Sequence, residues 1–219
     1  MIRKLNAPVP AHETCTSVMV FDPHEAQRLM AERAANGHDR YDEVWEGVYV
    51  MNPLADNEHQ DLVTELGTVF CIAITWQGLG KVFAGVNVSD RIDGWTFNYR
   101  GPDVVVVLNN SRARDMQTHY VGGPDFLVEV LSPGDRSRKK LPFYEQLGVR
   151  ELLLVGRDPW KLELFRLQEG HLKRVGNSTP KRSTRLESTV LPLTFRLVAG
   201  AARPQIAVAH HDEVQNWLV

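Results

Sequence analysis

Residues 124–131 read Pro-Asp-Phe-Leu-Val-Glu-Val-Leu, and this stretch decides the fold because it places an acidic residue inside an apolar run. Such a run is typical of a strand that is covered on both faces. Side chains alternate across a strand, so Leu127, Glu129 and Leu131 share one face. An unpaired carboxylate at Glu129 would be costly to desolvate, and the sequence therefore predicts a cation beside it.

A second apolar run begins at Asp103, where the chain reads Asp-Val-Val-Val-Val. Four consecutive valines favour another buried strand, and the polar connection ending at residues 122–124 is long enough to bring the two strands side by side. Two adjacent carboxylates raise each other's pKa unless a cation lies between them, which makes Mg²⁺ a natural partner for Asp103 and Glu129. Two separate salt bridges, or exposed strand ends, explain the residues alone equally well.

The remainder of the chain predicts a mixed sheet flanked by helices, a fold of the α/β (α+β) class. Asp22 and Pro23 are typical of a helix start, and Gly148 of a helix end. A turn at Asp93-Gly94 predicts that the strands at 81–88 and 95–99 pair as a hairpin. Helices are expected over 23–37, 57–77 and 137–147, and further strands over 41–51, 151–155, 161–167 and 189–197. We divide the chain into an extension with a helix (1–40), a main domain (41–200) and a C-terminal tail (201–219).

Composition indicates an ordinary soluble protein. The 219 residues are 43% hydrophobic and 24% charged, and no apolar stretch reaches the roughly 20 residues of a membrane span. With two cysteines and no secretory signal pattern, a cytoplasmic location without membrane contact is expected. The net charge of −2 provides no global attraction to polyanions, so contact with nucleic acid would depend on a local basic patch.

Three segments resemble the Uma-two (Uma2) family, a bacterial group with the restriction-endonuclease-like fold. These are Gly-Pro-Asp103, Pro-Asp-Phe-Leu-Val-Glu129-Val-Leu-Ser-Pro, and Lys140-Leu-Pro-Phe-Tyr144-Glu-Gln-Leu-Gly-Val149. Trp45-Glu46-Gly47, Met51-Asn52-Pro53 and His59 extend the resemblance, which covers residues 41–167, and residues 191–193 resemble the C-terminal strand of the family.

The resemblance implies a PD-(D/E)xK nuclease site that hydrolyses phosphodiester bonds of DNA. Asp103 and Glu129, with the carbonyl of Val130, would hold Mg²⁺ or Mn²⁺. Leu131 stands where the superfamily places its lysine on the strand. The Uma-two pattern places a lysine four residues before a tyrosine instead, as Lys140 and Tyr144 are here, and Lys140 would assist the attacking water.

Further residues are candidates for this site. Glu46 could complete the metal shell, although a glutamate at a strand edge is usually solvated. His59 could contact a phosphate or a carboxylate, although a histidine early in a helix is more often a cap or surface residue. Arg136, Arg138 and Lys139 precede Lys140 and could contact phosphate, with a solvated charged turn as the alternative.

A second class of function stays open at this stage. A nuclease-like fold that binds nucleic acid or a protein partner without cleaving would also explain the motifs, and Leu131 favours it. Two copies paired across a two-fold axis would present one site to each strand of a duplex, and the sequence leaves this homodimer open as well.

Overall fold

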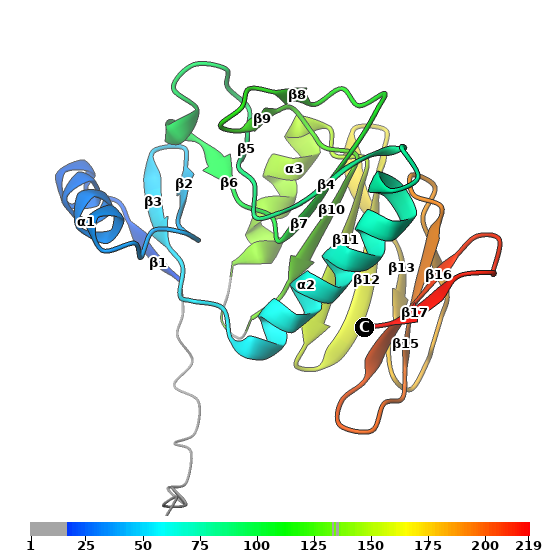
Figure 1. Cartoon of the computed structure of the whole chain (residues 1–219). Coiled ribbons are helices and arrows are strands. Elements are labelled where there is room, and N and C mark those ends of the chain that lie inside the picture. Colours follow the sequence, from blue (N-terminus) through cyan, green and yellow to red (C-terminus); the bar gives the residue numbers. More distant parts are fainter. Residues whose placement is uncertain (1–16, 133, 135) are drawn as a thin grey trace, which may run out of the picture.

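The structure is a computed structural model and describes residues 17–132, 134 and 136–219, so Cys15 lies outside the described residues. Its centre is a six-stranded mixed sheet (Figure 1). Only β10 and β11 run parallel, and the other neighbours pair antiparallel. The strand order is β13 (His171–Ser178), β12 (Trp160–Gln168), β11 (Glu151–Arg157), β10 (Phe126–Val130), β7 (Val104–Leu108) and β4 (Gly80–Ala84).

The two apolar runs form adjacent strands, as predicted. Val104 lies opposite Val128, and β7 and β10 pair antiparallel. Alternation along β10 divides its side chains between two cores: Phe126, Val128 and Val130 pack on one face, and Leu127 packs on the other. Both faces of β10 are therefore buried, which is why the strand is apolar throughout apart from Glu129.

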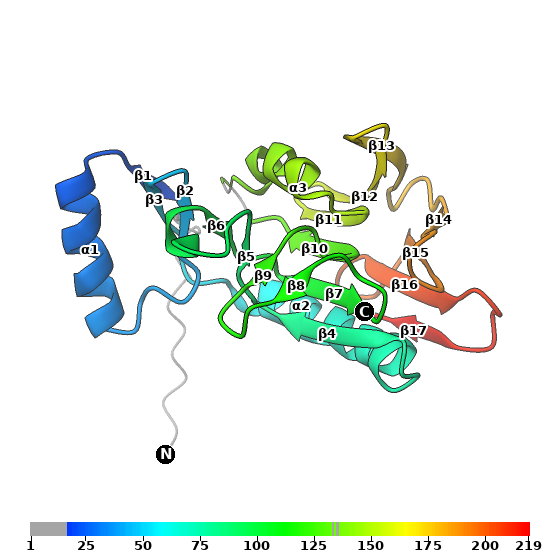
Figure 2. The ribbon, with the colours of Figure 1, turned by 90° about the horizontal axis from the view of Figure 1, so that it is seen from above.

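Helices cover the two faces of this sheet (Figure 2). The helix α2 (Asn57–Phe70) continues through the π-helical turn η1 (Cys71–Thr75) and lies on one face, and α3 (Leu141–Leu147) lies on the other. The 3-10 turn η3 (Ser137–Lys140) leads into α3, which ends at Gly148 with a left-handed φ of 81°. The helix α1 (Pro23–Ala35) begins at Asp22, whose side chain accepts from Glu25 N, as predicted. None of the described helices is long and apolar enough to cross a membrane.

The predicted hairpin of residues 81–88 and 95–99 is wrong. Strand β4 pairs with β7 in the central sheet, and residues 95–97 form the 3-10 turn η2 (Trp95–Phe97). Only β5 (Val88–Ser89) and β6 (Tyr99–Arg100) pair as expected across the turn. Gly80 explains the tertiary pairing, because a Cβ there would lie 2.4 Å from the Val107 carbonyl oxygen. Close packing of β4 on β7 thus outweighs the local turn signal.

Two further sheets, of seven short strands and of four strands, flank the central one. The first has the order β1 (Val18–Val20), β3 (Val48–Met51), β2 (Glu43–Trp45), β6, β5, β9 (Tyr120–Val121) and β8 (Arg114–Asp115). The second has the order β14 (Leu186–Glu187), β15 (Leu193–Val198), β16 (Gln205–His210) and β17 (Asn216–Leu218). Within the segment expected only as a tail, Ile206, Val208 and Val219 join the core on the α2 side of the central sheet.

Three cations surround the buried carboxylate of Glu163 on β12. Lys161 Nζ lies 2.8 Å and Arg174 Nη1 2.7 Å from Oε1, and Arg138 of η3 pairs with Oε2. Burial opposes ionisation, but hydrogen bonds from these cations outweigh it and lower the pKa of Glu163 from 4.5 to about 2. The ion cluster therefore connects β12, β13 and η3.

This cluster predicts a pH-dependent contribution to stability. The folded pKa lies below the unfolded one, so the contribution is present above pH 4.5 and is lost as the pH falls towards 2. The shift corresponds to about 3 kcal/mol. We expect Glu163→Gln to lower the free energy of unfolding by about 2 to 3 kcal/mol at pH 7 and to flatten its decline between pH 5 and 2, as measured by urea unfolding. Glu169→Gln, at an 85% exposed side chain, is the control; equal pH slopes for Glu163→Gln and wild type would contradict the prediction.

Candidate active site

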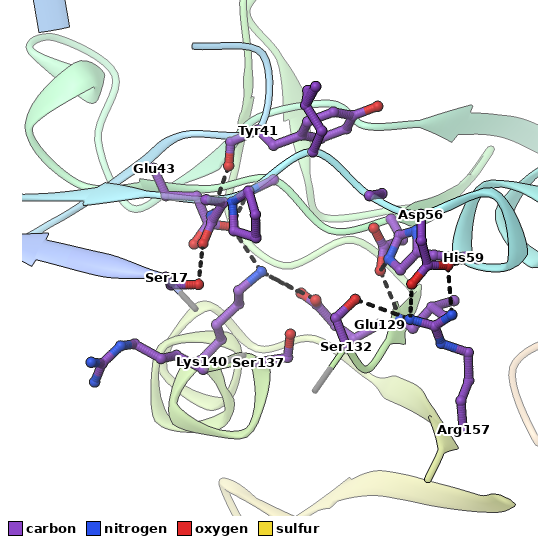
Figure 3. A pocket seen from close by; sticks show the side chains of 18 of the residues that line it. Ser17, Tyr41, Glu43, Asp56, His59, Glu129, Ser132, Ser137, Lys140 and Arg157 are labelled. Carbon is purple, nitrogen blue, oxygen red and sulfur yellow. Dashed lines mark hydrogen bonds and ion pairs between the residues drawn. The ribbon is translucent and has the colours of Figure 1, made fainter. Parts of the chain in front are cut away.

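A cavity of about 610 Å³ opens where β10 ends (Figure 3). Its walls come from β2, the connection between β3 and α2, the first turn of α2, the start of η3 and the end of β11. Asp103, Glu129, Val130, His59 and Lys140 all line it. The structure thus brings together residues that are up to 81 positions apart in the chain, from His59 to Lys140.

Lys140 lies between two carboxylates in this cavity (Figure 3). Its Nζ is 2.8 Å from Glu43 Oε1, and 3.1 and 3.2 Å from the two oxygens of Glu129. The 3-10 geometry of η3 explains the direction of this side chain, because residues three apart eclipse each other and Ser137 and Lys140 both face inwards. Burial favours the neutral amine, but Glu129 and Glu43 outweigh it and raise the pKa of Lys140. The lysine is therefore a buried cation.

Glu129 accepts a further hydrogen bond from α3, where the Tyr144 hydroxyl donates to Oε1 at 2.5 Å. Burial raises the pKa of Glu129 to about 7, against the opposing charge of Lys140. Burial also raises the pKa of Tyr144 well above its usual value, so this hydroxyl keeps its proton. The Lys140 ammonium and the Tyr144 hydroxyl thus both contact the Glu129 carboxylate. Lys140 belongs to η3, however, and Tyr144 to α3.

Asp103 precedes β7 and reaches the same cavity. Its Oδ2 accepts from Val130 N at 2.7 Å and lies 3.4 Å from His59 Nε2. Burial lowers the pKa of His59, but the hydrogen bond and charge of Asp103 outweigh it, so the net shift is upward. His59 is 7% exposed in the first turn of α2, which supports the prediction that it would contact a carboxylate.

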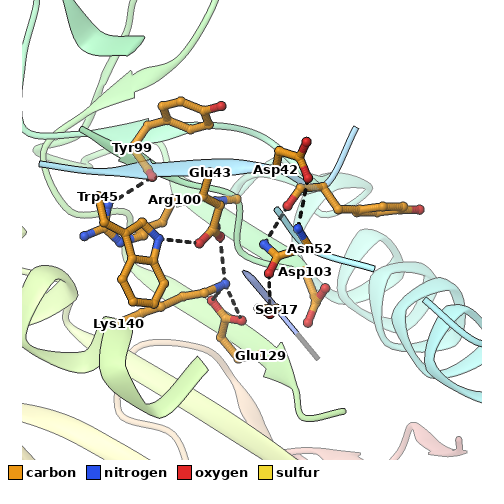
Figure 4. Close-up of polar contacts among 12 residues, drawn as sticks. Ser17, Asp42, Glu43, Trp45, Asn52, Tyr99, Arg100, Asp103, Glu129 and Lys140 are labelled. Atoms are coloured by element: carbon orange, nitrogen blue, oxygen red, sulfur yellow. Dashed lines mark hydrogen bonds and ion pairs between the residues drawn. The ribbon is translucent and has the colours of Figure 1, made fainter. Parts of the chain in front are cut away.

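Glu43 is a site residue that the sequence reasoning missed (Figure 4). Besides Lys140, it accepts from Trp45 Nε1 at 2.7 Å and from Gly101 N at 2.9 Å. Glu46, which we considered instead, is exposed in the turn between β2 and β3 and does not line the cavity. The signal for Glu43 was present, since it is an acidic residue in an apolar strand, as Glu129 is.

The predicted basic residues divide between the cavity and the outer surface. Arg136 lines the cavity, whereas Arg138 pairs with Glu163 outside it and Lys139 is exposed. Arg157, which the sequence reasoning missed, lines the cavity at the end of β11 and pairs with Asp56 at 2.7 Å. Within the described residues, His59 Nδ1 and Arg136 Nε are buried without a hydrogen-bond partner.

The donor set suits a hard divalent cation with few protein ligands. Among residues 17–132, 134 and 136–219, no three His, Cys, Asp or Glu side chains lie close enough together to hold a metal ion. Mg²⁺ commonly takes one or two carboxylates and completes its shell with water and substrate phosphate. Asp103, immediately before β7, and Glu129, on the neighbouring strand β10, line one cavity and provide such a pair. Residues and ion are therefore compatible.

The central mixed sheet with helices on both faces, and an acidic pair with a lysine at one edge, define a protein with the restriction-endonuclease-like fold. A family model described as "Putative restriction endonuclease" matches residues 26–199, and the chain belongs to this Uma2 family. The predicted resemblance is thereby confirmed.

Comparison with solved structures supports the fold assignment. The chain is similar to a protein described as a "putative nuclease belonging to DUF820" from Anabaena variabilis, with a TM-score of 0.53 and 18% identity. The similarity covers 68% of this chain and 83% of the other. At this identity it shows the fold alone. A comparison with curated proteins finds no match.

Proposed function

We propose that this protein is a Mg²⁺-dependent endonuclease that hydrolyses phosphodiester bonds of DNA. The observation that carries the proposal is the ion pair of Lys140 with Glu129, in the same cavity as Asp103. Two carboxylates and a lysine in one cavity are the groups that metal-assisted phosphodiester hydrolysis requires. The family description and the fold of the structural relative agree with this function.

Each residue has a defined part in the proposed reaction. Asp103 and Glu129, with the Val130 carbonyl, would hold the ion, which when bound polarises the phosphodiester and lowers the pKa of a bound water. Lys140 would bring a fixed positive charge to the phosphate and orient the attacking water through its ammonium. Its contacts with Glu129 and Glu43 restrict the side chain, so little reorganisation is needed during reaction.

Leu131 occupies the position where the superfamily places its lysine, and in this chain the lysine comes from another element. Its side chain packs against the core that contains Tyr144 and Leu154, and so it serves packing. Lys140 reaches the same carboxylate from η3, which lies on this face of the sheet. A lysine can therefore reach Glu129 in this chain without occupying the second position after it.

Two donors in the cavity wall support an anionic substrate. His59 Nδ1 and Arg136 Nε are buried and lack a partner among the described residues. A buried polar atom left unsatisfied is costly, and a phosphate oxygen is an acceptor that suits Arg136 Nε. It also suits His59 Nδ1 when the imidazole carries both protons, since Nε2 faces Asp103. The assignment of His59 and Arg136 to nucleic-acid contact therefore stays part of the proposal, whereas Arg138 and Lys139 lie outside the cavity.

A second candidate function is a nuclease-like fold that binds nucleic acid or a protein without cleaving it. The observation in its favour is that Lys140 forms ion pairs with both Glu129 and Glu43. Such an internal ion pair can serve structure alone. A cleavage assay separates the two functions, because only the endonuclease depends on a divalent ion.

We expect the wild-type protein to nick supercoiled plasmid in Mg²⁺ or Mn²⁺, and excess chelator to abolish the activity and fresh Mg²⁺ to restore it. Single-stranded circular DNA tested in parallel reports strandedness. Conversion of plasmid to open-circle and linear forms on agarose gels is the measurement. Absence of cleavage in every metal, from protein that unfolds cooperatively, would reject the enzyme and leave the binding function.

A further inference from the structure

A surface cluster of cations lies beside the proposed active site and outside its cavity. It consists of Arg138 from η3, Lys161 from β12 and Arg174 from β13, and is called here the cationic cluster. All three contact Glu163, whose side chain is 2% exposed. One carboxylate thus faces three cations, which leaves two positive charges unbalanced.

The geometry of the cluster leaves donors available to a ligand. The side chains of Arg138 and Arg174 are 52% and 53% exposed, and Lys161 is 31% exposed. Each guanidinium carries five N–H donors, and within the described part of the chain Glu163 is the acceptor that either guanidinium contacts. The buried carboxylate therefore holds the cations together while their outer donors face solvent.

Sheet register places the cluster close to the reacting groups. Glu129 lies opposite Leu154, and Leu154 lies opposite Glu163, so the two glutamates share one row and one face of the sheet. Two strand spacings separate them, which is roughly 10 Å. Lys161 lies opposite Gly156, at the end of β11 where Arg157 lines the cavity.

We propose that the cationic cluster is a phosphate-binding subsite for the backbone of the nucleic-acid strand whose scissile phosphate enters the cavity. This inference rests on the proposed function. A strand that leaves the cavity past η3 would bring a neighbouring phosphate to the exposed donors of Arg138 and Arg174. Guanidinium groups recognise phosphate through paired donors, and such contacts carry no base specificity.

The test measures binding without cleavage. A fluorescein-labelled single-stranded oligodeoxynucleotide of about 15 nucleotides is titrated by anisotropy, in chelator and over a series of salt concentrations. We expect Arg174→Gln to weaken binding about fivefold and to reduce the slope of log K against log salt by about 0.7, the value for one lost phosphate contact on a single strand. Arg174→Lys keeps the charge and is expected to retain most of the slope.

Lys173→Gln is the matched control. Lys173 is adjacent on β13 and lies opposite Arg166, whereas Arg174 lies opposite Phe165, so the two side chains face opposite sides of the sheet. Lys173→Gln removes the same charge from the face of the sheet opposite to the cationic cluster. It is expected to change affinity by less than about twofold, because salt screens the distant charge of Lys173 from the oligonucleotide. Melting temperatures of the variants show whether each one folds, and Lys161→Gln provides a second test on another strand.

The outcomes separate the subsite from the endonuclease. Wild-type affinity and salt slope in both Arg174→Gln and Lys161→Gln would overturn the subsite, as would failure of folded wild type to bind the oligonucleotide. A reduced slope in these variants, with no cleavage by wild type in any metal, would reject the endonuclease and leave the subsite supported.

Discussion

Replacing Glu129 by glutamine is expected to lower the rate of plasmid cleavage by about a thousandfold or more. The substitution removes the carboxylate that would bind the ion and that Lys140 contacts at 3.1 Å. Glutamine keeps the size of the side chain and can still accept from the Tyr144 hydroxyl, so the fold is expected to persist. Initial rates in saturating Mg²⁺, with melting temperature as the check on folding, measure the effect.

Asp125→Asn is the matched control for this variant. Asp125 is also an acidic residue on the Glu129 face of the same segment, but it does not line the cavity: it pairs with Arg150 at 3.0 Å and accepts from Leu108 N. Its loss is expected to affect stability and to leave the cleavage rate of the folded protein within a few-fold of wild type. Equal cleavage by Glu129→Gln and wild type would remove Glu129 from the reaction.

Replacing Lys140 by methionine is expected to destabilise the protein by about 3 to 5 kcal/mol, the cost of leaving buried charge uncompensated. Glu129 and Glu43 are 2% and 1% exposed, and Lys140 is the cation that contacts both. Methionine fills a similar volume, so the loss reflects charge more than packing. Urea unfolding at pH 7 measures it, and the deficit is expected to shrink at lower pH as the carboxylates take up protons.

A double variant isolates the cause of this loss. Removing one of the two carboxylates, as in Lys140→Met with Glu43→Gln, is expected to recover part of the lost stability while cleavage stays absent. Lys139→Met, at the exposed neighbouring position, is expected to leave both properties nearly unchanged. If Lys140→Met were as stable as wild type, the ion pairs would contribute little and the assignment of Lys140 as the buried cation would fail.

Glu129 and Lys140 belong to one buried ion cluster, which affects both stability and the proposed reaction. A buried ion cluster as a whole adds little net stability compared with apolar packing, because desolvation offsets much of the attraction between its charges. Removing the lysine alone is costly, because both carboxylates then stay buried without their cation. The same burial raises the pKa of Glu129, whereas the charges of Glu129 and Glu43 keep Lys140 protonated against the effect of burial. Buried ionisable groups with shifted pKa values are typical of functional sites, where holding charged side chains in fixed positions lowers the local stability.

Residue patterns identified the two buried strands beside Asp103 and Glu129, and the family resemblance pointed to Lys140. The alternation in residues 124–131 put Glu129 on the face where α3 packs, and the four valines after Asp103 marked the neighbouring strand. The strands could be predicted because local periodicity is visible in the sequence. The carboxylate stood out because a charge buried in such a strand is costly unless a partner compensates it. The same reasoning applied to β2 would have identified Glu43.

Tertiary structure decided which polar residues meet. Glu43 and Arg157 reach the cavity only because β2 and the end of β11 converge on the end of β10, and no spacing in the chain encodes that meeting. Strand β4 pairs with β7 and not with the strand after the Asp93-Gly94 turn, across which only β5 and β6 pair.

The sequence by itself determined the buried strands, the principal helices and the acidic pair, because these depend on short-range periodicity and on the cost of burying charge. The tertiary structure alone decided that η3 directs Lys140 inwards and Arg138 outwards, onto Glu129 and Glu163 of the same sheet row. Such contacts depend on long-range packing between elements, which fixes distances that neighbouring residues in the chain do not.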